Sequence, residues 1–178
     1  MAANIGNPFN KTEKQPMNYL SLDGIKLLLE QPDQSTPKGK RDVTLLSLMY
    51  DSGARVQEMI DLTPSSISFI NPYTVRLHGK GNKHRIVPLM ENQVELLMDY
   101  MKRNCLLEPY AGDYVLFDNG RVGKLTRMGV TRILKKYADM ARKIDAALIS
   151  KTVTPHVLRY PNFYIILTFV HKSLYYKR

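Results

Sequence analysis

The sequence has a single cysteine and no long hydrophobic segment. One thiol, Cys105, cannot form an intramolecular disulfide or a cysteine-based zinc site, which is usual for proteins of reducing compartments. The apolar run at residues 164–170 is far too short to span a bilayer, and residues 1–4 do not begin a signal peptide. These absences predict a cytoplasmic protein without a membrane anchor.

Acidic residues are scarce in one part of the chain. Residues 1–100 carry 11 basic and 11 acidic side chains, whereas residues 101–178 carry 15 basic and 5 acidic ones. The whole net charge of +10 therefore lies in the C-terminal part. Such a surplus favours a polyanionic partner, either nucleic acid or, as the weaker alternative, an anionic membrane surface.

The chain has the size and composition of one folded domain. Its 178 residues are 44% hydrophobic and 24% charged, which excludes a disordered or fibrous protein. Polar residues 1–18 indicate a linker, and residues 31–40 indicate a loop because they contain two prolines and a glycine. The remaining patterns predict helices that begin at Ser21 and at Pro155 and helices over residues 42–51, 56–62, 91–103 and 126–147. They also predict a β-hairpin of residues 74–78 and 85–89 and a short strand over residues 114–117. The expected fold class is α+β, mostly helical, with a small antiparallel sheet.

Several basic side chains stand at breaks between these elements. Arg55 follows Gly53 at the junction of two helices, Lys80 lies at the tip of the hairpin turn, and His156 and Arg159 are one helical turn apart. Two arginines can hold both non-bridging oxygens of a phosphodiester, while lysine and histidine can exchange protons with the attacking and leaving oxygens. The set suits phosphoryl transfer without a metal ion, and the sequence lacks the clustered carboxylates of a two-metal nuclease. Taken singly, each of these cations is most simply a surface charge.

Other basic residues are candidates for contacts with DNA phosphates. Lys83 and Arg85 lie beside the hairpin turn, and Arg132, Lys135 and Lys136 lie on the predicted basic helix. The same residues would also suit a solvated surface, because charged side chains are mostly exposed whatever their function. Both interpretations fit the pattern.

Three segments together resemble the tyrosine recombinase (phage integrase) family. They are residues 52–59 (SGARVQEM), 79–89 (GKGNKHRIVPL) and 154–159 (TPHVLR), and they follow the order of that family's motifs. The resemblance implies the tyrosine recombinase catalytic-domain fold and double-stranded DNA as the partner. Assembly into a homo-oligomer on DNA is a further expectation, and no cofactor, metal or membrane is implied.

The resemblance also implies a role for each matching residue. Arg55 and Arg159 match the two catalytic arginines, and Glu58 matches the acid that supports the first of them. Lys80 matches the general acid toward the leaving 5′ oxygen, and His156 matches a proton-transfer partner of the nucleophile. In this family a tyrosine attacks the scissile phosphate and forms a 3′-phosphotyrosyl bond.

The match ends abruptly after Arg159. The family continues with a helix, a Leu-Gly-His box and the nucleophilic tyrosine, whereas Pro161 would interrupt such a helix here and His171 has no Leu-Gly before it. Tyr175 and Tyr176 lie too close to Arg159 to match the nucleophile.

These features predict three regions: a linker (1–18), an incomplete catalytic domain (19–160) and an atypical tail (161–178), for which a frameshift near codon 160 is one hypothesis. The expected function is that of a DNA recombinase or integrase fragment from a mobile element, inactive in strand transfer because no tyrosine matches the nucleophile. One alternative is a non-catalytic DNA-binding or regulatory module with the same fold. Another is that Tyr175 or Tyr176 acts as the nucleophile.

Overall fold

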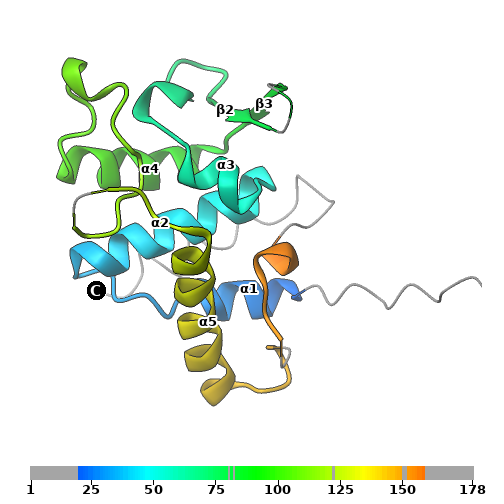
Figure 1. Cartoon of the computed structure of the whole chain (residues 1–178). Helices are drawn as coiled ribbons and strands as arrows, with labels where there is room; N and C mark the ends of the chain where they lie inside the picture. Colours follow the sequence, from blue (N-terminus) through cyan, green and yellow to red (C-terminus); the bar gives the residue numbers. More distant parts are fainter. Residues whose placement is uncertain (1–19, 80, 82, 122, 150–151, 159–178) are drawn as a thin grey trace, which may run out of the picture.

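The computed structural model describes residues 20–79, 81, 83–121, 123–149 and 152–158 (Figure 1). The helices are α1 (Leu22–Leu29), α2 (Pro37–Ser52), α3 (Val56–Ile60), α4 (Glu91–Arg103) and α5 (Arg127–Ile144), with short 3₁₀ turns η1 (Pro64–Ser66), η2 (Pro109–Ala111) and η3 (Pro155–Leu158). The strands are β1 (Ile67–Ser68), β2 (Thr74–His78) and β3 (His84–Pro88), and they form one antiparallel sheet in that order. The predicted fold class, mostly helical with a small antiparallel sheet, is confirmed.

Two helices begin at the capping residues expected from the sequence. The hydroxyl of Ser21 accepts the N–H of Gly24 at 3.1 Å, and the hydroxyl of Thr126 accepts the N–H of Gly129 at 3.0 Å. Each bond satisfies a backbone donor that has no partner within the first turn of the helix. The positions of α1 and α5 therefore follow from local sequence.

The beginning of α2 differs from the prediction. Residues 31–40 were expected to form a loop, but the helix already begins at Pro37. The Thr36 hydroxyl caps it by accepting the N–H of Gly39 at 3.0 Å. Proline is well suited to the first helical position because its φ is preset and its missing N–H has no partner there anyway. The proline marks the start of a helix and not the interior of a loop.

The expected short strand over residues 114–117 is also wrong. Leu116 donates one backbone hydrogen bond to Leu62 at 2.9 Å, and an isolated bridge joins Asp118 to Lys124. The apolar pattern reflects burial, because Leu116 and Phe117 are fully buried and the Phe117 ring stacks on Tyr100 with 5.4 Å between centroids. Burial of an irregular segment produces the same hydrophobic run as a strand.

Helix α2 lies at the centre of the molecule. Helices α1, α3 and α4 all pack against it, and the residues expected to face the core are fully buried: Leu45, Leu46, Leu48 and Met49. A helix covered on several sides is apolar around most of its circumference. None of the helices within the described ranges is long and apolar enough to cross a membrane.

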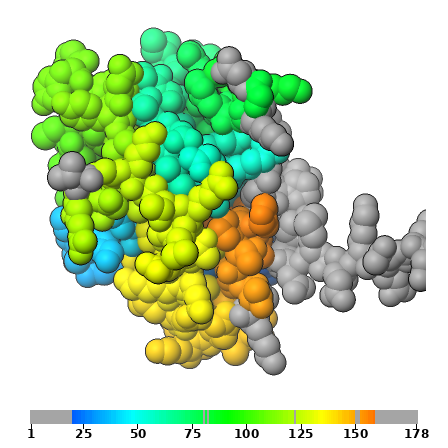
Figure 2. All heavy atoms as spheres, in the orientation of Figure 1, coloured from blue at the N-terminus to red at the C-terminus, as the bar shows by residue number. Residues whose placement is uncertain are grey.

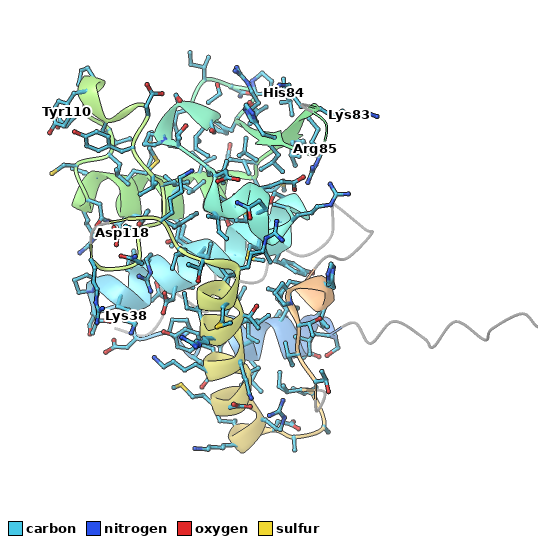
Figure 3. The ribbon with its side chains drawn as sticks, viewed as in Figure 1. Lys38, Lys83, His84, Arg85, Tyr110 and Asp118 are labelled. Atoms are coloured by element: carbon cyan, nitrogen blue, oxygen red, sulfur yellow. The ribbon has the colours of Figure 1, made fainter. Side chains whose placement is uncertain are left out.

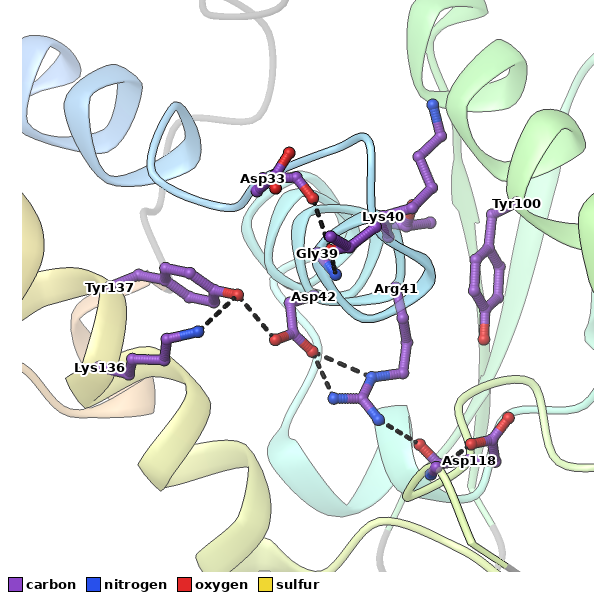
Figure 4. Close-up of polar contacts among 12 residues, drawn as sticks. Asp33, Gly39, Lys40, Arg41, Asp42, Tyr100, Asp118, Lys136 and Tyr137 are labelled. Carbon is purple, nitrogen blue, oxygen red and sulfur yellow. Dashed lines mark hydrogen bonds and ion pairs between the residues drawn. The ribbon is translucent and has the colours of Figure 1, made fainter.

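A buried ion pair on α2 joins it to two later segments (Figure 4). The Arg41 guanidinium donates to Oδ1 of Asp42 at 2.6 and 2.9 Å and to the carbonyl oxygen of Asp118 at 3.0 Å. The Tyr137 hydroxyl on α5 donates to Oδ2 of Asp42 at 2.9 Å. Burial together with this carboxylate raises the pKa of Tyr137 above its usual range. The Asp42 carboxylate thus connects helix α2, the loop at Asp118 and helix α5.

We expect Asp42→Asn to lower the free energy of unfolding by about 3–5 kcal/mol, because it leaves the buried Arg41 charge uncompensated. Tyr137→Phe removes one hydrogen bond to a charged group and should cost about 1.5–3 kcal/mol. Urea unfolding measures both effects. Asp23→Asn, at an exposed position, is the control, and an Asp42→Asn effect as small as the control's would contradict the role of this network.

Candidate functional site

The junction of α2 and α3 determines where Arg55 lies. Gly53 ends α2 in the left-handed conformation (φ 56°), which glycine adopts without strain. Ala54 is fully buried, and Arg55 follows as the N-cap residue of α3. The Arg55 side chain remains 58% exposed. A buried residue on one side and a helix on the other hold its backbone, while the guanidinium is open to a ligand.

Glu58, one turn into α3, is surrounded by donors. Its side chain is only 2% exposed. Oε2 accepts the backbone N–H of Arg55 at 2.6 Å, which caps the helix, and Oε1 accepts Nη1 of Arg55 at 3.1 Å. The Arg85 guanidinium binds both oxygens, with Nη1 at 2.6 Å from Oε1 and Nη2 at 2.8 Å from Oε2.

These contacts keep Glu58 ionised. Burial opposes the charge, but hydrogen bonds from Arg85 and from the Arg55 backbone outweigh it and hold the pKa of Glu58 below its usual value. The ionised carboxylate fixes Arg55 through both its backbone and its side chain. Arg85, which the sequence suggested as a DNA-phosphate contact, directs its guanidinium toward this carboxylate.

The β2–β3 hairpin approaches the same carboxylate. A Cβ atom added to Gly79 would lie 3.4 Å from Oε1 of Glu58 and 3.9 Å from Nη1 of Arg55. The residue before Lys80 therefore borders the Arg55–Glu58 pair, although Lys80 itself lies outside the described residues. Lys83 is exposed at the other end of the turn (Figure 3).

His156 lies on a separate segment of the chain. It lies on η3, which packs against α5, and its side chain is exposed. In Figure 2 this segment, in orange, forms part of the same molecular surface as α5, in yellow. Arg159 lies outside the described residues, so among the four predicted catalytic residues the structure describes Arg55 and His156.

Helix α5 presents the expected basic surface. Val130, Ile133 and Leu134 are buried at helical spacing, whereas Arg132, Lys135 and Lys136 are exposed. The Lys136 ammonium lies 4.5 Å from the centroid of the Tyr137 ring. Arg132 and, one turn later, the adjacent pair Lys135 and Lys136 form an exposed basic surface that could accept phosphates.

Two polar contacts that sequence patterns did not indicate hold α5 beside α3. The Arg127 guanidinium donates to the side-chain oxygen of Gln57 at 2.8 Å, and the Lys124 ammonium lies 3.1 Å from Oδ1 of Asp61. Each pair joins residues more than 60 positions apart, so no local motif could have revealed it. The contacts place the basic helix next to the helix that begins at Arg55.

Asp51 is an unusual carboxyl group in the last turn of α2. Its Oδ2 atom is buried and has no hydrogen-bond partner among the described residues. Burial disfavours the charged form and raises the pKa of Asp51 to about 8. A carboxyl group that is mostly protonated at neutral pH therefore lies four residues before Arg55.

Comparison with known proteins identifies the family. The model of the Phage integrase family matches residues 18–162. The chain belongs to this family. It is 40% identical to the tyrosine recombinase XerD of Staphylococcus epidermidis over 152 residues, which is 84% of this chain and 49% of that protein. The chain thus spans about half the length of the curated relatives that it matches.

Solved structures of tyrosine recombinases share the fold of this phage integrase family member. The XerH site-specific recombinase bound to its difH substrate, in a pre-cleavage complex, is 26% identical with a TM-score of 0.66 over 84% of this chain and 43% of XerH. The XerA recombinase is 27% identical with a TM-score of 0.63 over 79% of this chain and 47% of XerA. The predicted family and fold are therefore confirmed.

We expect Arg85→Met to lower the free energy of unfolding by about 1–3 kcal/mol, because it leaves the buried Glu58 carboxylate with fewer donors. Arg85→Lys should recover only part of this loss, since an ammonium cannot bind both oxygens in the same way. Urea unfolding is the measurement. Arg76→Met, on the exposed face of the same hairpin, is the matched control, and equal effects of the two methionine variants would contradict the proposed role of Arg85.

We expect Asp51→Asn to stabilise the protein increasingly as the pH rises. The folded pKa of about 8 lies above the usual aspartate value of 3.8, so the native state binds the extra proton and the free energy of unfolding of the wild type falls between about pH 4 and pH 8. The variant lacks this fall and should gain about 1 kcal/mol or more at pH 8. Urea unfolding from pH 5 to pH 8 tests this, with exposed Asp113→Asn as control. A pH-independent difference would refute the raised pKa.

Proposed function

We propose that residues 19–160 form a tyrosine recombinase catalytic module that binds double-stranded DNA at the surface shared by Arg55, the hairpin and helix α5. The observation that carries the proposal is the fixed Arg55 guanidinium, held by a buried, ionised Glu58 and yet 58% exposed. A cation held in this way can bind a phosphate with little loss of side-chain entropy. The family match over residues 18–162 supports these boundaries.

The proposed roles follow the family's reaction. Arg55 and Arg159 hold the two non-bridging oxygens of the scissile phosphate and stabilise the charge that develops on them. Lys80 donates a proton to the leaving 5′ oxygen, and His156 exchanges a proton with the attacking group. Glu58 is a positioning residue, since it acts through Arg55.

DNA contacts outside the reacting phosphate are proposed for the exposed basic residues. Arg132, Lys135 and Lys136 lie on one helix, and Lys83 lies beside the turn that begins at Gly79. Phosphate contacts of this kind supply affinity that does not depend on sequence and that weakens with salt. Arg85 is assigned a smaller share because its guanidinium is directed at Glu58.

The 178-residue chain tested by itself is proposed to bind DNA without joining to it. Covalent attachment requires a tyrosine oxygen in line with the phosphorus atom and the leaving 5′ oxygen. No tyrosine after Arg159 matches the family's nucleophile motif. A DNA-binding or regulatory role without catalysis is the second candidate function, and it is favoured by the same mismatch.

We expect a salt-sensitive gel shift with duplex DNA. Arg132→Ala and Lys135→Ala should each weaken binding to all sequences and reduce the slope of log K against log salt by about 0.9. Lys102→Ala, which removes an exposed lysine of α4, is the matched control. Variants of α5 that bind as well as the control would remove that helix from the proposed DNA surface.

The same preparation, incubated with a nicked suicide duplex, should give no covalent adduct on a denaturing gel. An adduct that disappears in Tyr175→Phe or Tyr176→Phe would overturn this expectation and assign the nucleophile. The absence of any gel shift at low salt would contradict both candidate functions, because each requires DNA binding.

A further inference from the structure

The outer face of the β2–β3 hairpin carries two histidines opposite each other. His78 ends β2, His84 begins β3, and the antiparallel register pairs them directly. Their ring centroids are 4.1 Å apart with an interplanar angle of 82°. Both side chains are exposed, whereas Val75, Leu77 and Val87 occupy the buried face. The pair is thus separate from the Glu58 cluster, which involves the inward-facing Arg85.

This arrangement fits the requirements of a metal chelate. Two imidazole nitrogens bound to one zinc ion, each about 2.0–2.1 Å from it, place the ring centres roughly 5 Å apart. Because both histidines are exposed, small rotations about their side-chain bonds can move the rings from 4.1 Å to that separation. Imidazole is a preferred ligand of zinc, copper and nickel. Directly opposed residues on neighbouring strands are the closest non-local pairs that a sheet offers.

We propose that His78 and His84 chelate a divalent cation of the zinc type on the outer face of the hairpin. Within the described ranges, no group of three or more His, Cys, Asp or Glu residues could hold a metal. The protein therefore supplies two ligands there, and water completes the coordination, as in an exchangeable surface site and unlike a closed structural one. Arg76 lies on the same face and lowers the affinity for a cation, although solvent screens exposed charges.

The position of the two histidines lets a bound ion stabilise the hairpin. The two histidines flank the turn that begins at Gly79, beside Arg55 and Glu58. A chelated ion would link the two strands next to the turn, and because it binds both ligands only in the paired hairpin it would stabilise the folded form. This inference does not depend on the proposed DNA function, because its readouts are metal binding and stability.

The test is a calorimetric titration of the chain with Zn²⁺ alone. The Cys105→Ser background is used because the exposed thiol of Cys105 could compete for the ion. We expect one site that depends on both histidines, with His78→Ala and His84→Ala each lowering the affinity by about tenfold or more, since even changes around a ligand cost that much. The Zn²⁺ affinity of the double variant should be no lower than that of either single variant, because the chelate is already lost when one ligand is removed.

His171→Ala, which replaces a histidine outside the hairpin sequence, is the control and should bind like the background protein. Zn²⁺ should also raise the melting temperature of the background protein but not that of the double variant. Unchanged affinity in either single variant would overturn the proposal. Two independent sites, each lost with one histidine, would overturn it as well, because they would exclude chelation.

Discussion

The buried carboxylate of Glu58 is the interaction on which the candidate site depends. It accepts the N–H that begins α3, the side chain of Arg55 and both arms of the Arg85 guanidinium. A charge in a buried position is tolerated only when its oxygens are fully hydrogen-bonded. Because the donors come from a helix start and from a strand, satisfying this one carboxylate also sets the hairpin against the α2–α3 junction.

A second buried carboxylate, Asp42 in the first half of α2, likewise joins separate parts of the chain. Asp42 is fully buried and joins Arg41 to Tyr137 of helix α5. The basic residues of α5 and the guanidinium of Arg55 are therefore both held relative to the same central helix. Rigid placement matters for a phosphate-binding surface, because the cations are then oriented before the ligand arrives. Two ionic networks and an apolar core thus hold the exposed cations of Arg55 and α5 in place.

The sequence predicted most of the elements because their signals are local. Ser21 and Thr126 mark helix starts, Gly53 marks a helix end, and alternating residues mark β2 and β3. The two errors have different causes. The start of α2 was placed too late because Pro37 was interpreted as part of a loop, although proline favours the first position of a helix. The strand expected over residues 114–117 was wrong because burial and regular structure are not the same property. Residues 114–117 are buried without being a strand, since an irregular segment under the core shows the same apolar run as a strand.

By itself, the sequence determined the fold class, the family, and Arg55, Glu58 and His156 as candidates, because these depend on short motifs and their order. Only the tertiary structure decided what Arg85 does, since its partner Glu58 lies 27 positions earlier in the chain. The same holds for Asp42 and Tyr137, which are separated by 95 positions. Long-range polar contacts of this kind leave no periodic trace in a sequence, because they arise only when the fold brings the two partners together.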